Sequence, residues 1–214
     1  MFLNYKRGLT NLYRNWGLMV YLYAKFRLKI YPLELLHTYM PNEGTIIDLG
    51  SGYGIYTNYL ALKSKTRQVL GIDSNPRRIS IAKKIIKNRL NIDFKVQDSK
   101  EVKLFPCNGL LMTDFLHHIP ISAQNDLLQN VYTILKPDGI CVIGDVNTDC
   151  KPRWKYWISY LSDIILYPFS DKLYFRSSQE MQTVISNIGF KVKIITLQRC
   201  ITAGVLYICY KKEN

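Results

Sequence analysis

The sequence predicts an α/β fold in which a mainly parallel sheet is covered by helices on both faces. From about residue 45, short β-rich runs alternate with amphipathic helical segments, and most runs are almost continuously apolar, as strands buried on both faces are. The first five runs are residues 45–49, 68–73, 92–96, 109–113 and 140–146. Two more, 190–197 and 204–210, have no helix-length segment between them, which predicts an antiparallel hairpin at the sheet edge.

Start and stop signals place the helices between these runs. Asn75 followed by Pro76 is a helix cap with proline at the first helical position, and it opens a helical stretch over 76–90. A second helix is expected to begin at a Ser122 cap and to stop at the Lys-Pro-Asp-Gly sequence of residues 136–139.

The last predicted helix carries the clearest local signal. Ser177 and Glu180 have the spacing of a capping box, in which each side chain binds the other's backbone N–H. The helix is expected to run to Asn187, and Gly189 is expected to end it.

Composition limits the class of protein. With 214 residues the chain is long enough for one substantial core, and a net charge of +13 favours an anionic partner, either nucleic acid or a membrane surface. Five cysteines without a Cys-x-x-Cys spacing indicate reduced thiols in a cytoplasmic protein. The apolar stretch at 16–24 is too short to span a bilayer, so any membrane contact is expected to be peripheral, at the inner face.

A glycine-rich turn follows the first strand. Gly50, Gly52 and Gly54 occupy every second position after the apolar run at 45–49. A strand, a glycine turn and a helix start together can cradle a nucleotide, because glycine lets backbone N–H groups approach the ligand. The spacing matches neither the dinucleotide fingerprint nor the phosphate loop. A tight turn without a ligand is the alternative.

Polar residues follow the next strands at the same edge of the sheet. Asp73 ends the second strand, where a carboxylate can accept both hydroxyls of a ribose or can simply cap a helix. Asp98 follows the third strand, where it can accept a hydrogen bond from an adenine amino group. The sequence Thr-Asp-Phe-Leu-His-His-Ile-Pro follows the fourth strand. Open α/β sheets bind ligands at this carboxyl edge.

This ordered set resembles the class I S-adenosylmethionine-dependent methyltransferases, especially the branch that methylates quinone-like and lipid small molecules. The resemblance covers residues 45–210 and implies a Rossmann-like, seven-stranded sheet of order 3-2-1-4-5-7-6, mostly parallel, with the last strand antiparallel. It implies S-adenosyl-L-methionine as cofactor and S-adenosyl-L-homocysteine as product. The residues it assigns to the cofactor are Asp48, Gly50, Ser51, Gly52, Gly54, Asp73, Ser74, Asp98, Ser99, Thr113 and Asp114.

The resemblance also implies which part of the cofactor each group meets. Asp48 and the glycine turn would hold the methionine part, with Thr113 and Asp114 bordering that end. Asp73 would bind the ribose, and the residues after it and around Asp98 would border the adenine. Gly54 would let the following helix pack close to the strand. For Asp48, an alternative is that the carboxylate only satisfies nearby backbone amides.

His117 and His118 are the candidate catalytic residues. Methyl transfer mainly requires alignment of the acceptor, but a general base helps when the acceptor is a hydroxyl, and histidine titrates near neutral pH. The alternative is that one ring packs in the core while the other lines the pocket. A metal site with Asp114 is disfavoured, because adjacent helical residues point about 100° apart and no further carboxylate is nearby in sequence. No metal is therefore expected.

Two segments outside the strand–helix alternation are expected to face the acceptor. Residues 1–43 are predicted to form an amphipathic helical extension, and residues 147–176 an aromatic insertion that covers the site of a methyltransferase domain spanning 44–214. A basic helix rich in tryptophan and tyrosine suits an anionic membrane interface, or it covers the cofactor pocket. The predicted substrate-pocket residues are Tyr13, Trp16, Trp154, Trp157 and Tyr160.

Taken together, the sequence predicts an S-adenosylmethionine-dependent methyltransferase (EC 2.1.1.-) for a hydrophobic, lipid-like small molecule, with membrane-associated acceptors favoured. The first alternative is an RNA methyltransferase, supported by the charge of +13. The second is a non-catalytic protein that uses the same fold to bind a membrane or another subunit.

Overall fold

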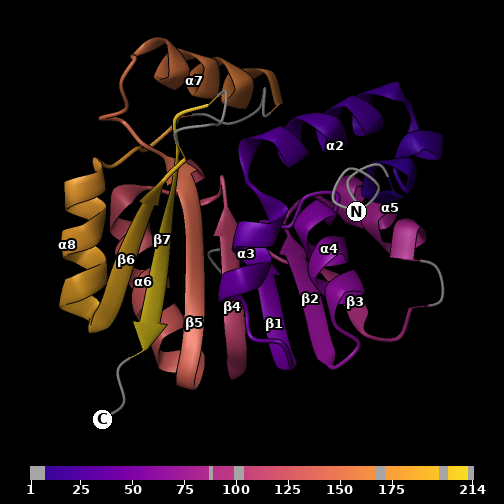
Figure 1. Ribbon diagram of the computed structural model, residues 1–214, viewed down its shortest axis with the longest axis horizontal. Coiled ribbons are helices and arrows are strands. Elements are labelled where there is room, and N and C mark those ends of the chain that lie inside the picture. The colour runs from indigo at the N-terminus through magenta and orange to yellow at the C-terminus, as the bar shows by residue number, and fades with distance from the viewer. Residues whose placement is uncertain (1–7, 87–88, 99–103, 167–171, 198–201, 212–214) are drawn as a thin grey trace. The chain divides into compact units, whose positions relative to one another are not determined.

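The computed structural model describes residues 8–86, 89–98, 104–166, 172–197 and 202–211. The chain forms two compact units, Met1–Lys103 and Leu104–Asn214. The sheet has seven strands in the order β3-β2-β1-β4-β5-β7-β6, which confirms the predicted fold class and strand order (Figure 1).

The first unit contributes three parallel strands. The carboxyl ends of its strands form the edge at which a ligand is expected. In Figure 1 helix α2 lies beyond the carboxyl ends of β1 and β2. Its elements are η1 (Arg14–Trp16), α2 (Leu18–Ile30), α3 (Leu33–Tyr39), β1 (Gly44–Leu49), α4 (Ile55–Lys63), β2 (Arg67–Asp73), α5 (Pro76–Ile86) and β3 (Ile92–Val96).

The second unit contributes four strands. Strand β4 is parallel to β5, and β7 is antiparallel to both β5 and β6, so the predicted edge hairpin is confirmed. In Figure 1 helix α8 lies beside β6 and helix α7 lies beyond the carboxyl end of β5. The elements are β4 (Cys107–Thr113), η2 (Leu116–His118), α6 (Ile121–Ile134), β5 (Leu135–Val146), α7 (Trp154–Leu166), α8 (Ser178–Ile188), β6 (Phe190–Thr196) and β7 (Gly204–Lys211).

Two of the three predicted helix starts are confirmed and one is wrong. The Asn75 side chain accepts hydrogen bonds from the first-turn N–H groups of α5 at 3.0 and 3.1 Å, and the Ser177–Glu180 capping box is present. Helix α6 instead begins at Ile121 after Pro120, with no side-chain cap. The helix ends at Ile134, just before the predicted stop at 136–139, and the stop residues lie within the bounds of β5.

The N-terminal segment is not one continuous amphipathic helix. Gly17 has φ +101°, outside the helical region, and separates η1 from α2. On one continuous helix Met19 would lie on the apolar face and Leu28 outside it, whereas in the structure Met19 is exposed and Leu28 is buried. Within the described ranges, no helix reaches the length and hydrophobicity that crossing a bilayer requires.

The ring of Phe94 on β3 fixes the core of the first unit. A Cβ atom at Gly71 of β2 would lie 2.4 Å from this ring, and one at Gly54, which caps α4, would lie 2.3 Å from it. Phe94 is fully buried. Two glycines on different elements therefore leave the space that one aromatic side chain fills.

The Gly71→Ala substitution tests this packing. We expect it to lower the free energy of unfolding by about 1–3 kcal/mol, because overpacking a tight core costs this much. The matched control is Gly8→Ala, since among the described residues outside its own helix no atom lies within 4 Å of a Cβ atom built at Gly8. Urea denaturation followed by circular dichroism measures both. Equal effects of the two substitutions would contradict the role assigned to Phe94.

Candidate functional site

The glycine turn after β1 is held by the end of β2. The N–H groups of Gly50 and Ser51 donate to the Ile72 carbonyl oxygen at 2.8 and 3.0 Å, and the N–H of Gly52 donates to Asp73 Oδ2 at 2.8 Å. Gly50, Gly52 and Gly54 have φ values of +79°, +55° and +74°, in the region that favours glycine. The turn is thus set by bonds within the first unit.

Asp48 lies at the end of β1, buried beneath this turn. Its Oδ2 accepts a hydrogen bond from the Thr57 hydroxyl of α4 at 2.5 Å, while Oδ1 has no hydrogen-bond partner among the described residues. Burial raises the pKa of Asp48 to about 6, because the loss of hydration outweighs the bonds from Thr57. An open, buried acceptor atom of this kind fits the positively charged amino group of a methionine moiety.

Asp73 is already engaged in shaping the turn. Besides the bond from Gly52, its Oδ1 accepts from the N–H of Asn75 at 2.9 Å. Each carboxylate oxygen has two acceptor sites, so these bonds leave capacity for ribose hydroxyls. Ser74 and Asp98 are exposed, whereas Ser99 lies outside the described residues.

Helix α2 approaches the same turn. The Tyr23 hydroxyl lies 3.3 Å from the position that a Cβ atom of Gly52 would take, and the Tyr23 ring meets Tyr53 edge to face at 5.1 Å between centroids. Arg78 of α5 lies over both rings, at 5.9 and 5.7 Å. This part of the N-terminal segment therefore lies against the glycine turn, and its role in covering the cofactor pocket remains a prediction.

The second unit carries the remaining predicted cofactor residues at the end of β4. Thr113 is buried, and Asp114 adopts φ +47°, which is uncommon for a residue other than glycine. The N–H of Asp114 donates to the Gly144 carbonyl oxygen of β5 at 2.9 Å. Their contact with the cofactor remains a prediction, as do the contacts of the residues in the first unit.

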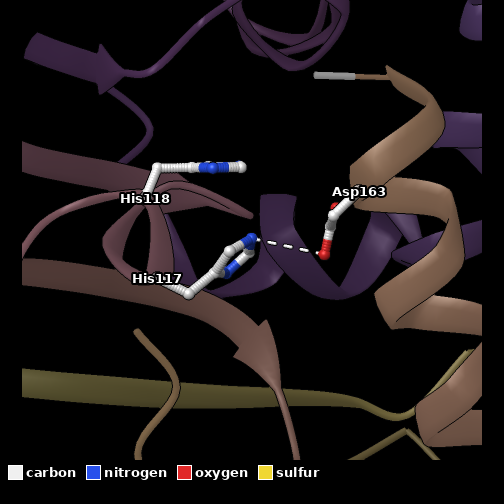
Figure 2. Close-up of side chains that lie close together, drawn as sticks. All are labelled: His117, His118 and Asp163. Atoms are coloured by element: carbon white, nitrogen blue, oxygen red, sulfur yellow. Dashed lines mark ion pairs between the residues drawn. The ribbon is translucent and has the colours of Figure 1, made fainter. Parts of the chain in front are cut away.

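The two predicted catalytic histidines lie in η2, directly after β4. His117 is fully buried and His118 half-buried, with 4.4 Å between the ring centroids. His117 Nδ1 lies 2.5 Å from Oδ1 of Asp145 in β5, and its Nε2 lies 3.4 Å from Oδ2 of Asp163 in α7 (Figure 2). One imidazole is therefore placed between two carboxylates from different elements.

These carboxylates set the charge of His117. Burial alone lowers the pKa of the imidazole, but Asp145 and Asp163 together outweigh this effect and hold the pKa well above its usual value. A ring whose pKa is raised in this way holds its second proton more firmly than a free imidazole does, which does not suit His117 as a general base. His118 is the more exposed ring of the pair.

Aromatic side chains enclose the histidine pair. The Phe175 ring stacks on His117 with 4.9 Å between centroids, and Tyr156 and Tyr160 of α7 contact Phe175 at 6.0 and 6.4 Å. Phe175, Asp145 and Asp163 were not predicted. Asp145 was detectable, since it lies at the carboxyl end of a strand as Asp73 does, but nothing in the sequence pairs Asp163 with a histidine 46 positions earlier.

Gln124 of α6 anchors the backbone around the histidines. Its buried side-chain amide donates to the carbonyl oxygens of Leu116, Ile119 and Tyr174 at 3.0, 2.9 and 3.0 Å. Its own oxygen accepts from Arg176 Nε at 2.8 Å, and the N–H of Tyr174 donates to the His117 carbonyl oxygen at 2.7 Å. The end of the insertion is thus tied to the loop that carries the histidines.

The predicted substrate-pocket residues differ widely in exposure. Tyr13 is fully buried, and its hydroxyl accepts a hydrogen bond from the Asn58 amide at 3.0 Å. Trp16 is half-buried, with Lys84 Nζ 5.8 Å above its ring. In the second unit Tyr160 is half-buried, whereas Trp154 and Trp157 are exposed. Their role in binding an acceptor remains a prediction.

The family follows from a sequence comparison. A model of the methyltransferase domain matches residues 21–193. The chain belongs to this methyltransferase family. Its cofactor is therefore S-adenosylmethionine, in agreement with the open Asp48 oxygen and the glycine cradle. The family match supports a transferase and leaves its acceptor open.

Two curated relatives match half of the chain. A carboxy-S-adenosyl-L-methionine synthase from Nautilia profundicola is 26% identical over 114 residues, which are 53% of this chain and 49% of the relative. A putative methyltransferase, 235L, from Invertebrate iridescent virus 6 is 27% identical over 131 residues, 55% of this chain and 48% of the relative. The chain spans about half the length of these relatives.

Solved methyltransferases share the fold. A SAM-dependent methyltransferase from Aquifex aeolicus has a TM-score of 0.64 at 18% identity and covers 87% of this chain and 93% of its own. An O-methyltransferase family 2 protein from Planctomyces limnophilus, solved with apigenin, has a TM-score of 0.67 at 19% identity and covers 84% of this chain and 57% of its own.

The Asp48→Asn variant tests the buried carboxylate. A folded-state pKa of about 6 against an ordinary 3.8 means that Asp48 stabilises the fold fully below about pH 4 and loses this contribution as the pH rises through 6. Asparagine cannot ionise. The free energy of unfolding of the variant, relative to wild type, should therefore rise by about 2–3 kcal/mol between about pH 4 and pH 7. A pH-independent difference would refute the assignment.

The Asp73→Ala variant tests the predicted ribose contact. We expect its dissociation constant for S-adenosylhomocysteine, measured by titration calorimetry, to rise at least about 10-fold, or about 1.4 kcal/mol, because both the ribose acceptor and the tether of the turn are lost. The matched control is Asp93→Ala, an exposed carboxylate on the neighbouring strand β3, which should bind as wild type does. An unchanged affinity of Asp73→Ala would exclude the contact.

Proposed function

We propose that this methyltransferase acts on a hydrophobic small molecule that it meets at an anionic membrane surface. The observation that carries the proposal is an exposed apolar face on α7, the helix of the predicted aromatic insertion. The face consists of Trp154, Trp157, Leu161, Ile164 and Ile165. These positions recur at helical spacing and so fall within one stripe of the helix.

The exposure of this face is unusual for side chains of this size. The exposed fraction is 55% for Trp157 and 72% for Ile165, although burial of each such side chain is worth about 1.5–3 kcal/mol. Contiguous exposed apolar side chains mark interaction sites. Lys151 and Arg153, directly before the helix, are also exposed, and basic residues beside an apolar helical face suit an interface with anionic lipid.

His118, the more exposed ring of the pair, supports an acceptor that must lose a proton, such as a hydroxyl. It lies at the carboxyl end of β4, the edge at which open α/β sheets bind their ligands. When bound, the cofactor supplies an activated methyl group, so this chain has to align the acceptor, exclude water and manage the acceptor's proton. A solved structure of similar fold is an O-methyltransferase family 2 protein in complex with apigenin, and we extend O-methylation to this chain as part of the proposal.

RNA is the second candidate acceptor. The net charge of +13 supports it, because phosphate contacts by lysine and arginine dominate nucleic-acid affinity. The apolar face of α7 argues for lipid, since a groove for nucleic acid needs cations and isolated stacking rings more than adjacent isoleucines.

Labelled methyl transfer distinguishes the two acceptors. The full chain is incubated with methyl-labelled S-adenosylmethionine and, separately, with a lipid extract and total RNA from the same cells. We expect label in the lipid fraction and none in RNA. Label in RNA alone would overturn the proposal.

Vesicle flotation tests the membrane surface itself. Wild type should float with vesicles that contain phosphatidylglycerol and much less with neutral phosphatidylcholine vesicles. The double variant Trp157→Ser, Ile165→Ser should bind roughly 100-fold more weakly, because two inserted apolar side chains are lost. The matched control is Leu90→Ser, since Leu90 is 95% exposed but lies outside α7. Equal flotation of both variants would contradict the assignment.

A further inference from the structure

We propose that His117, His118 and Asp163 form a site for a divalent transition metal ion of the zinc class, held between η2 and α7 with one coordination position open. One ligand atom from each of the three residues can be chosen so that all lie within 4.8 Å of one another. The set of two imidazoles and one carboxylate matches the ligands of open, catalytic-type zinc sites.

The spacing of His117 and Asp163 fits a shared ion. Two ligand atoms that each lie about 2.0–2.1 Å from a tetrahedral zinc ion are about 3.3–3.4 Å apart. Nε2 of His117 and Oδ2 of Asp163 are 3.4 Å apart (Figure 2). A direct charge-assisted hydrogen bond would be about 2.7–2.9 Å. Nε2 is also buried without a hydrogen-bond partner among the described residues, so its contact with Asp163 is an ion pair without a hydrogen bond of good geometry.

Asp145 supports the proposed site by contacting the other ring nitrogen of His117, Nδ1. A carboxylate can only accept, so the 2.5 Å contact between Asp145 Oδ1 and His117 Nδ1 places the Nδ1 proton in that bond. Histidine ligands of metal ions usually donate their second N–H to a carboxylate, which fixes the ring and directs the other nitrogen toward the ion. The geometry of His117 between Asp145 and Asp163 has this form.

The third ligand needs only a small movement. The rings of His117 and His118 are 4.4 Å apart between centroids and tilted by 46°, so the His118 ring borders the same space. Closing a separation of at most 4.8 Å to a tetrahedral edge of about 3.4 Å requires a shift of roughly 1.4 Å. His118 is only half-buried, so rotation of its side chain can supply that shift.

An ion here would also balance charge. Asp145 and Asp163 are each 6% exposed, and a protonated His117 ring between them supplies only one positive charge for the two buried carboxylates, which an ion bound in place of its Nε2 proton would exceed. A divalent ion would neutralise both and would join α7 to the loop after β4. On the function proposed above, and only on it, the open position would take the acceptor oxygen and ease loss of its proton.

Metal binding is tested without any methyl acceptor. The full chain is stripped with chelator and titrated with Zn²⁺ by calorimetry and with Co²⁺ by visible absorption. We expect one equivalent to bind. Asp163→Asn should weaken binding by at least about 100-fold, and Asp145→Asn by about 10–100-fold, as loss of a supporting carboxylate does. The matched control is Asp149→Asn, in the same insertion but outside the cluster, which should bind as wild type does.

A second measurement uses only the wild-type protein, so it does not depend on the folding of any variant. X-ray absorption of the zinc-loaded wild type should show nitrogen and oxygen ligands with scattering from two imidazoles, and no sulfur at about 2.3 Å. Absence of stoichiometric binding, sulfur ligation, or equal affinity of Asp163→Asn and Asp149→Asn would each overturn the site. Failure to methylate lipid would overturn the proposed acceptor and leave the metal site standing, so the two failures are distinguishable.

Discussion

The first unit depends on one steric constraint, the space around the Phe94 ring. Strand β3 supplies the ring, and β2 and the start of α4 each supply a glycine, so that no Cβ atom of Gly71 or Gly54 competes with it. This close packing brings the end of β2 against the turn after β1. Ile72 and Asp73 can then accept the backbone N–H groups of that turn. The shape of the turn that would hold the cofactor is therefore set by core packing and by hydrogen bonds within the first unit.

The second unit has to stabilise charged side chains in an apolar interior. His117 receives a carboxylate on each side, an aromatic ring on its face and, at its carbonyl oxygen, the N–H of Tyr174. Gln124 satisfies three further carbonyl oxygens of the same region. A buried polar network destabilises the fold when one member is missing. The fold of this unit is therefore expected to need all of these residues together.

The sequence predicted the strands well because strand formation depends on short-range signals, whereas the sheet order came only from the family resemblance. Continuous apolar runs, the Asn75 cap and the Ser177–Glu180 box all act within a few residues. Ser122 misled because Pro120, with φ −52°, already sets the entry into α6. The pairing of Asp163 with His117 could not be predicted, since it depends on how α7 lies against η2. The N-terminal segment does not form one amphipathic helix because Gly17 adopts a non-helical backbone conformation, which a periodicity of apolar residues does not reveal.

The anchoring of the insertion has an evolutionary consequence. At one end, Asn147 Oδ1 accepts the N–H of Asp149 at 3.0 Å and the Ser178 hydroxyl at 3.1 Å. At the other end, Gln124 and Arg176 hold the backbone near Tyr174. These hydrogen bonds are made with the sheet, α6 and α8, and not with the exposed face of α7. The exposed residues of α7 can therefore vary without loosening these anchors, whereas Asp163 on the same helix is constrained by its ion pair with His117.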